Sequence, residues 1–88
     1  MSQADMVLLE WAEDAAVMRE FAQSRAWTVL LKHIQRAYDS ELGVVMSTTD
    51  MNRLLTSRGA AAAWTHIGAL PENIIAEERR LRAEKESR

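Results

Sequence analysis

Residues 27–42 read WTVLLKHIQRAYDSEL, and this stretch decides the fold class of the chain. Its large apolar side chains recur at steps of three and four residues, which places them on one face of an α-helix; they are Trp27, Leu31, Ile34, Tyr38 and Leu42. Gly43 suits the left-handed position that follows a helix, with apolar Val44 behind it. We therefore predict an amphipathic helix that ends at Leu42.

A second amphipathic helix is predicted before this stretch, over about residues 4–23. Its apolar stripe has the same spacing and consists of Leu8, Trp11, Ala15, Met18 and Ala22. Ser2 and Asp5 have S-x-x-D spacing, in which the serine hydroxyl accepts a hydrogen bond from a free backbone N–H of the first turn. At residues 23–25 two alternatives stay open: Ser24 caps a new helix, or the chain remains helical without a break.

A third helix is predicted over about residues 48–68. The connection before it is short, so the helix should run back antiparallel to residues 25–42. Ser47 and Asp50 repeat the S-x-x-D start. The run GAAAA at residues 59–63 is nearly free of side chains, and it would let a neighbouring backbone approach closely.

Pro71 is predicted to separate the third helix from a short C-terminal helix. The residue before a proline avoids the α conformation, so the third helix should close at Leu70. Proline is well placed in the first turn of a helix, because the backbone N–H groups of that turn have no hydrogen-bond partner within the helix. The mixed-charge tail, residues 79–88, is expected to fray unless it finds a partner.

The chain has 88 residues and no cysteine, so we expect a single helical domain over residues 1–88 without disulfides or thiolate zinc sites. A chain this short buries only about 60–65% of its unfolded surface, and oligomerisation is then a usual source of stability. The predicted fold is all-α: an antiparallel helical hairpin with an N-terminal amphipathic helix and a short C-terminal helix, assembled as an oligomer.

The charges are distributed unevenly along a chain whose net charge is −2. Residues 4–23 carry five acids and one base, whereas residues 24–42 carry three bases and two acids. The acidic helix of one copy would therefore be complementary in charge to the basic helix of another. Such complementarity favours a particular register and pairing more than it raises affinity. No secretion leader precedes the first helix and no apolar run is long enough to span a bilayer. We expect a cytoplasmic protein without a membrane partner.

Catalytic and metal-binding motifs were sought among the histidines and acids. His33 and His66 belong to no spaced ligand pair, so solvated or half-buried histidines are the plain interpretation. Glu10, Glu13 and Asp14 could form a carboxylate cluster, but no nucleophile or oxyanion-binding turn accompanies them. A solvated helix face, or an acidic patch for a basic partner, fits better. We predict no enzyme, no catalytic residue, and no cofactor or metal.

A nucleic-acid contact would use Arg25, Lys32 and Arg36, which share one side of the predicted helix. Asp39 and Glu41 follow closely, and acids offset the five bases of the tail. Nucleic-acid-binding domains usually concentrate positive charge on one face. This partner is therefore the weakest of the expectations.

Protein is the partner that the apolar residues favour. The three tryptophans fall on the apolar stripes, which is more typical of core packing than of exposed anchors. A contiguous apolar turn at residues 44–46 would be unusual on a monomer's surface, and the first helix has more apolar surface than one hairpin can cover. The predicted interface comprises Val7, Trp11, Met18, Phe21, Val44, Val45 and Met46.

Two stretches together resemble small helical-hairpin proteins of tailed bacteriophages. The first is AWTVLLKHI at residues 26–34, and the chain then returns through RGA at residues 58–60 to ALPENIIAE at residues 69–77. The resemblance spans about residues 24–78 and departs from the pattern in its short apolar connection. Such proteins tend to be encoded among head and packaging genes, so the resemblance implies a viral protein in the host cytoplasm or the virion. It implies no site residues.

The leading hypothesis is a non-catalytic phage-type interaction or structural protein. It would act through helix–helix packing in a homo-oligomeric helical bundle or in a virion-assembly complex with other phage proteins. One alternative is a small phage-encoded regulator that binds and inhibits a host or phage protein. A weaker alternative is a DNA-packaging accessory that binds nucleic acid through Arg25, Lys32 and Arg36.

Overall fold

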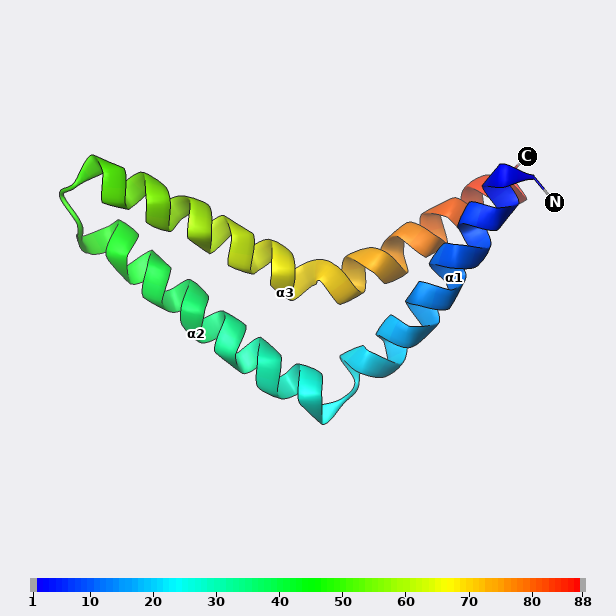
Figure 1. Ribbon diagram of the computed structural model, residues 1–88, viewed down its shortest axis with the longest axis horizontal. Coiled ribbons are helices and arrows are strands. Elements are labelled where there is room, and N and C mark those ends of the chain that lie inside the picture. The colour runs from blue at the N-terminus through cyan, green and yellow to red at the C-terminus, as the bar shows by residue number, and fades with distance from the viewer. Residues whose placement is uncertain (1, 88) are drawn as a thin grey trace. The chain divides into compact units, whose positions relative to one another are not determined.

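The protein is all-helical in a computed structural model that describes residues 2–87. Three helices follow one another along these residues: α1 (Gln3–Ala22), α2 (Arg25–Ser47) and α3 (Met51–Glu86) (Figure 1). They contain 92% of the described residues, among which there is no strand. The all-α class predicted from the apolar spacing is confirmed.

The first two helices begin at the serines that the sequence indicated. The Ser2 hydroxyl oxygen accepts a hydrogen bond of 3.1 Å from the Asp5 backbone N–H, and α1 starts at Gln3. The Ser24 hydroxyl oxygen accepts one of 3.1 Å from the Trp27 N–H. Ser24 therefore caps α2, and the alternative of one unbroken helix through residues 23–25 is excluded.

The predicted end of α2 at Leu42 is wrong, because the helix continues to Ser47. No glycine among the described residues has a positive φ, so Gly43 is an ordinary helical residue. Glycine inside a helix costs about 1 kcal/mol, and the extra turn compensates by placing Val44 and Val45 in half-buried positions. In the last turn of the longer helix, the Gly43 carbonyl accepts a hydrogen bond of 2.7 Å from the Ser47 hydroxyl.

The predicted capping of the third helix by Ser47 is also wrong, because Ser47 already belongs to α2. Asp50 takes the capping role instead: its Oδ1 accepts hydrogen bonds from the N–H groups of Asn52 at 2.9 Å and Arg53 at 3.4 Å. The helix α3 consequently begins at Met51.

A separate C-terminal helix opened by Pro71 is not present, because Pro71 lies inside α3. Proline cannot donate to the carbonyl four residues earlier, and an interior proline costs a helix about 3 kcal/mol. Packing on both sides outweighs this cost. Gly68 lies against α2, while Pro71 itself and Glu78 are buried. The segment 79–86 stays helical and has a partner, since Lys85 pairs with Asp5.

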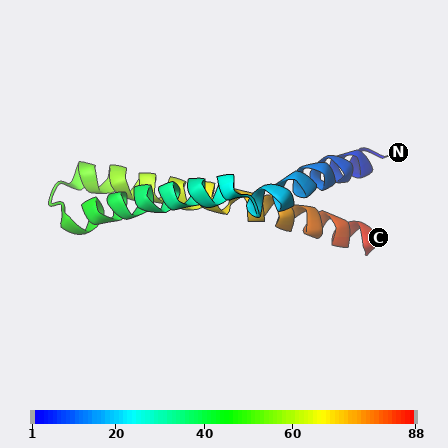
Figure 2. The ribbon, with the colours of Figure 1, turned by 90° about the horizontal axis from the view of Figure 1, so that it is seen from below.

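The chain forms two compact units, and the boundary within α3 falls between Ala69 and Leu70. One unit, residues 28–69, packs α2 beside the first part of α3, as Figures 1 and 2 both show. Its buried residues are small: Ser57 is 6% exposed and Ala61 8%. Within the predicted close-approach run at residues 59–63, only Ala61 is buried, and Gly59 has no neighbour within 4 Å of an added Cβ.

The other unit packs α1 against the second part of α3, residues 70–86. Asp5 Oδ1 lies 2.9 Å from Lys85 Nζ, and Arg19 Nη2 lies 3.2 Å from Glu78 Oε2, so the two helices run in opposite directions. Ala15 on α1 and Glu78 on α3 are both completely buried. Among the residues of this unit that the structure describes, no large apolar side chain is fully enclosed.

Candidate protein interface

Exposed apolar side chains are the main feature of the surface of residues 2–87. The buried residues there are few and small or charged: Ala15, Ser57, Ala61, Pro71 and Glu78. Twelve large hydrophobic residues are at least 36% exposed, namely Met6, Val7, Leu9, Val17, Val29, Leu30, Leu42, Met46, Met51, Leu55, Ile67 and Leu70. Two helices side by side have too little thickness to enclose these residues.

The predicted interface residues of α1 differ in exposure. Val7 is 39% exposed, whereas Trp11, Met18 and Phe21 are half-buried. Phe21 already has an internal partner, because its ring centroid lies 5.4 Å from that of Trp27 in a tilted arrangement. Aromatic pairs of this separation stabilise the contact beyond simple area burial. The Phe21–Trp27 contact therefore joins the end of α1 to the start of α2, and Phe21 is only partly available to another subunit.

The predicted apolar residues 44–46 lie in the last turn of α2 and not in a connecting loop, which corrects the sequence interpretation. Val44 and Val45 are half-buried there. Met46 is 80% exposed, the largest exposed fraction among the large hydrophobic residues. Met46 is consequently the member of this group most available to a partner.

Sequence reasoning missed a second apolar line on α1. Met6, Leu9 and Val17 are 60%, 51% and 59% exposed. They lie away from the apolar stripe of α1 that was predicted to pack. The sequence feature that could have indicated their exposure is that α1 carries apolar residues around most of its circumference, and one neighbouring helix cannot cover all of them. On α3, Met51 and Leu55 are also exposed, at 66% and 55%.

The cations proposed for a nucleic-acid contact are all exposed on α2. Arg25, Lys32 and Arg36 take part in none of the ion pairs found among residues 2–87. Three charges at this spacing form a narrow stripe. Lys32 and Arg36 belong to the unit of residues 28–69, and Arg25 belongs to the other unit.

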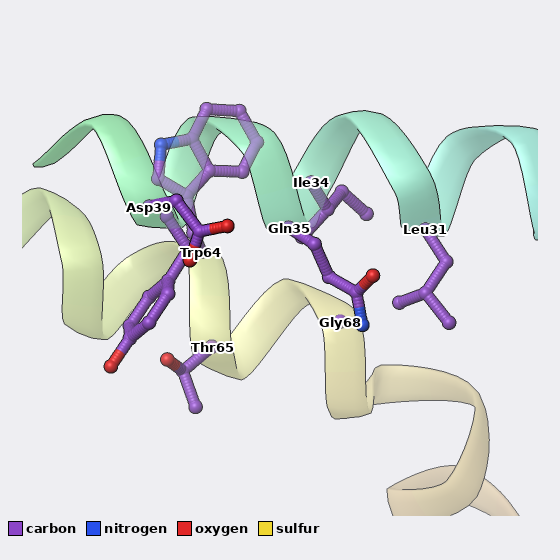
Figure 3. Close-up of a pocket in the computed structure, with 8 residues that line it drawn as sticks. Leu31, Ile34, Gln35, Asp39, Trp64, Thr65 and Gly68 are labelled. Carbon is purple, nitrogen blue, oxygen red and sulfur yellow. The ribbon is translucent and has the colours of Figure 1, made fainter. Parts of the chain in front are cut away.

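An open groove of about 510 Å³ lies between α2 and α3 in the unit of residues 28–69 (Figure 3). Leu31 and Ile34 reach it from α2, and Trp64 and Gly68 reach it from α3. Its polar lining consists of Gln35, Tyr38, Asp39 and Thr65. A groove with leucine, isoleucine and tryptophan in its lining suits the insertion of an apolar side chain from another helix.

A second groove, of about 340 Å³, lies in the other unit. Leu8, Leu9 and Ala12 supply its apolar surface. Its charged lining residues are already paired with one another, since Asp5 binds Lys85 and Glu78 binds Arg82. The surface it leaves for a partner is therefore mainly leucine.

The histidines and acids form no metal-type cluster in the part of the chain that the structure describes. His33 and His66 are both exposed. Within residues 2–87 no helix combines the length and the apolar character needed to cross a membrane.

Comparison with known proteins gives no relative: no family model, curated protein or solved structure matches this chain.

Proposed function

We propose that this chain is a non-catalytic interaction or structural protein that works by helix–helix packing, as a homo-oligomer or as one component of an assembly complex. The observation that carries the proposal is the imbalance between interior and surface. Twelve large hydrophobic residues are exposed, whereas the fully enclosed side chains of residues 2–87 are those of Ala15 and Glu78.

Burial of the exposed hydrophobic side chains is the source of free energy for association. Removing one Val, Leu, Ile or Met side chain completely from water contributes about 1.5–3 kcal/mol. Association itself costs about 4–15 kcal/mol in lost translational and rotational freedom. The twelve side chains are 36–80% exposed, so each contributes roughly half of that value on burial. Five or six of them from each of two subunits then contribute about 8–18 kcal/mol, which is comparable with the cost of association.

The finer arrangement we propose is a long antiparallel hairpin, formed by α2 and the first part of α3, that acts as the packing element of an oligomer. Its groove at Leu31, Ile34 and Trp64 would accept apolar side chains, and Met46 would contact a neighbouring subunit. A place in bacteriophage assembly is supported by the resemblance of residues 24–78 and by nothing else.

The test is the solution mass of the purified chain, measured by sedimentation equilibrium over a range of concentrations. The monomer mass is 10.0 kDa, and we expect a mass several times larger. A stable monomer would contradict the homo-oligomer and favour the alternative of a regulator that binds a different protein.

The chosen surface is tested by Trp11→Ala and by Val45→Asp, each of which should lower the assembled mass. Retained helicity in circular dichroism separates loss of association from loss of folding. An unchanged mass in both variants would remove this surface from the proposal.

A further inference from the structure

The side of α1 that faces away from α3 carries two acidic residues between two apolar ones. Met6, Glu10, Glu13 and Val17 follow at steps of four, three and four residues and share one helix face. Buried Ala15 lies on the opposite face. Met6 and Val17 are 60% and 59% exposed. Glu10 and Glu13 are exposed and take part in no ion pair found among residues 2–87.

A matching face of opposite charge lies on α2. Val29, Lys32 and Arg36 follow at steps of three and four and share the side of α2 opposite Leu31 and Ile34, which face Gly68. Val29 is 41% exposed. Lys32 and Arg36 are exposed, and neither has an acidic partner within the described chain.

The spacing of the two faces matches when the helices are placed antiparallel. Val17 then lies opposite Val29, Glu13 opposite Lys32, and Glu10 opposite Arg36, because the steps along both helices have similar lengths. A parallel placement that keeps the two valines opposite leaves Arg36 beyond the end of α1 and without an acid. Of the two placements that bring the valines together, the antiparallel one is therefore the one in which both cations find a carboxylate.

We propose that the face of α1 formed by Met6, Glu10, Glu13 and Val17 docks antiparallel on the face of α2 formed by Val29, Lys32 and Arg36 in a second copy of this chain. The inference rests on the proposed function and names the contact within it. Every copy has both faces, so each can make the contact twice, reciprocally or in a head-to-tail series. The valines provide apolar burial, and the charges set register and exclude like-charged pairings.

Two charge-reversed variants test the contact by sedimentation. Glu10→Lys/Glu13→Lys makes both faces basic, and Lys32→Glu/Arg36→Glu makes both faces acidic. Each variant alone should associate with a dissociation constant at least about tenfold higher than that of the wild type, because like charges then face each other. An equimolar mixture should recover the wild-type mass, since each altered face finds its complement on the other variant.

Matched controls reverse the same number of charges elsewhere. Arg53→Glu/Arg58→Glu and Glu72→Lys/Glu86→Lys alter exposed residues of α3 that lie outside both faces, and both should assemble as the wild type does. Unchanged circular dichroism in every variant shows that the helices are intact.

The outcomes separate this inference from the proposed function. A wild type that assembles, with reversed variants that assemble equally well or a mixture that does not recover, would overturn the inference and leave the oligomer standing. A monomeric wild type would remove this inference together with the homo-oligomer, and would leave only packing against a different protein. Loss of DNA retention by Lys32→Glu/Arg36→Glu without loss of self-association would also overturn it, and would assign α2 to a nucleic acid instead.

Discussion

Arg19 Nη2 lies 3.2 Å from Glu78 Oε2, and the Glu78 side chain is completely buried while that of Arg19 remains 40% exposed. The other Glu78 oxygen binds Arg82, one turn further along α3. A buried carboxylate is tolerated only when charged or hydrogen-bonding groups replace its water, and here two guanidinium groups do so. The contact fixes α1 against α3 within one unit at a position where no large apolar side chain is enclosed.

Replacing Glu78 by alanine should lower the free energy of unfolding by about 1–3 kcal/mol. The cost stays moderate because Arg19 and Arg82 are partly exposed and can be hydrated again. Urea unfolding followed by circular dichroism measures it. Glu84→Ala is the control, since Glu84 is 56% exposed in its pair with Arg80 and exposed pairs contribute little. An equal loss in both variants would show that the burial of Glu78 has no special role.

Gly68→Ala should stabilise the unit of residues 28–69. A Cβ at this position would lie 3.6 Å from Ile34 Cγ2 and 3.7 Å from Leu31 Cδ1, which are ordinary van der Waals distances. Alanine also restricts the unfolded chain, so the gain should be about 0.5–1 kcal/mol. That corresponds to a rise of about 2–8 °C in Tm for a chain of this size.

Gly59→Ala is the matched comparison for Gly68, because a Cβ there meets no atom within 4 Å. It should gain from helix propensity alone and stabilise no more than Gly68→Ala does. Gly68→Leu should destabilise, since its larger side chain would overlap Leu31 and Ile34. A destabilising Gly68→Ala would contradict the packing described for this helix pair.

Met46→Asp should reduce the assembled mass with little change in the stability of the separated subunit. The Met46 side chain is 80% exposed, so within one copy it has few contacts to lose. In a subunit contact a buried aspartate without a partner is strongly unfavourable. Asn52→Asp introduces the same charge at an exposed position and should leave the mass unchanged. If both variants assemble equally well, Met46 lies outside the interface.

The carboxyl group of Asp5 should titrate below its ordinary range. The hydrogen bond from Lys85 is the main cause that lowers the pKa of Asp5, and the contacts with Ser2 lower it further. A folded-state pKa below the unfolded one means that this contribution is present at neutral pH and is lost as the pH falls through the folded value. Lys85→Gln should therefore raise the Asp5 pKa in an NMR titration of the carboxyl carbon.

Glu77 provides the internal reference for that titration. The hydrogen bond from Arg80 lowers the pKa of Glu77, and the same pair raises the pKa of Arg80. Lys85→Gln should leave the Glu77 pKa unchanged, because Lys85 is not among its causes. A Glu77 pKa that moves together with that of Asp5 would indicate a general change in α3 and not the loss of one pair.

Local sequence signals predicted the helices but not all of their ends. The Ser2 cap acts within a few residues of itself, so it could be predicted directly. Ser24 was one of two alternatives, and the structure shows that it caps α2. Gly43 and Pro71 carry equally strong local signals for an ending, yet both are helical. At each, contacts made by the following residues outweigh a local preference of about 1–3 kcal/mol.

The candidate interface could be predicted only in part. Val7 and Met46 are exposed, whereas the Phe21 ring contacts that of Trp27. Met6 and Val17 were overlooked, because an α-helix with apolar residues on several sides does not reveal which side meets the neighbouring helix. Choosing that side needs the partner helix.

By itself the sequence determined that the chain is helical, where α1 begins, and that it has more apolar surface than a short chain can hide. These are properties of residue spacing and of contacts within a turn. Only the tertiary structure decided that α3 runs through Pro71, and that Glu78 is buried beside Arg19, 59 positions away. The physical reason is that a pairing between distant segments depends on which helix faces meet, and helical spacing alone does not specify that choice.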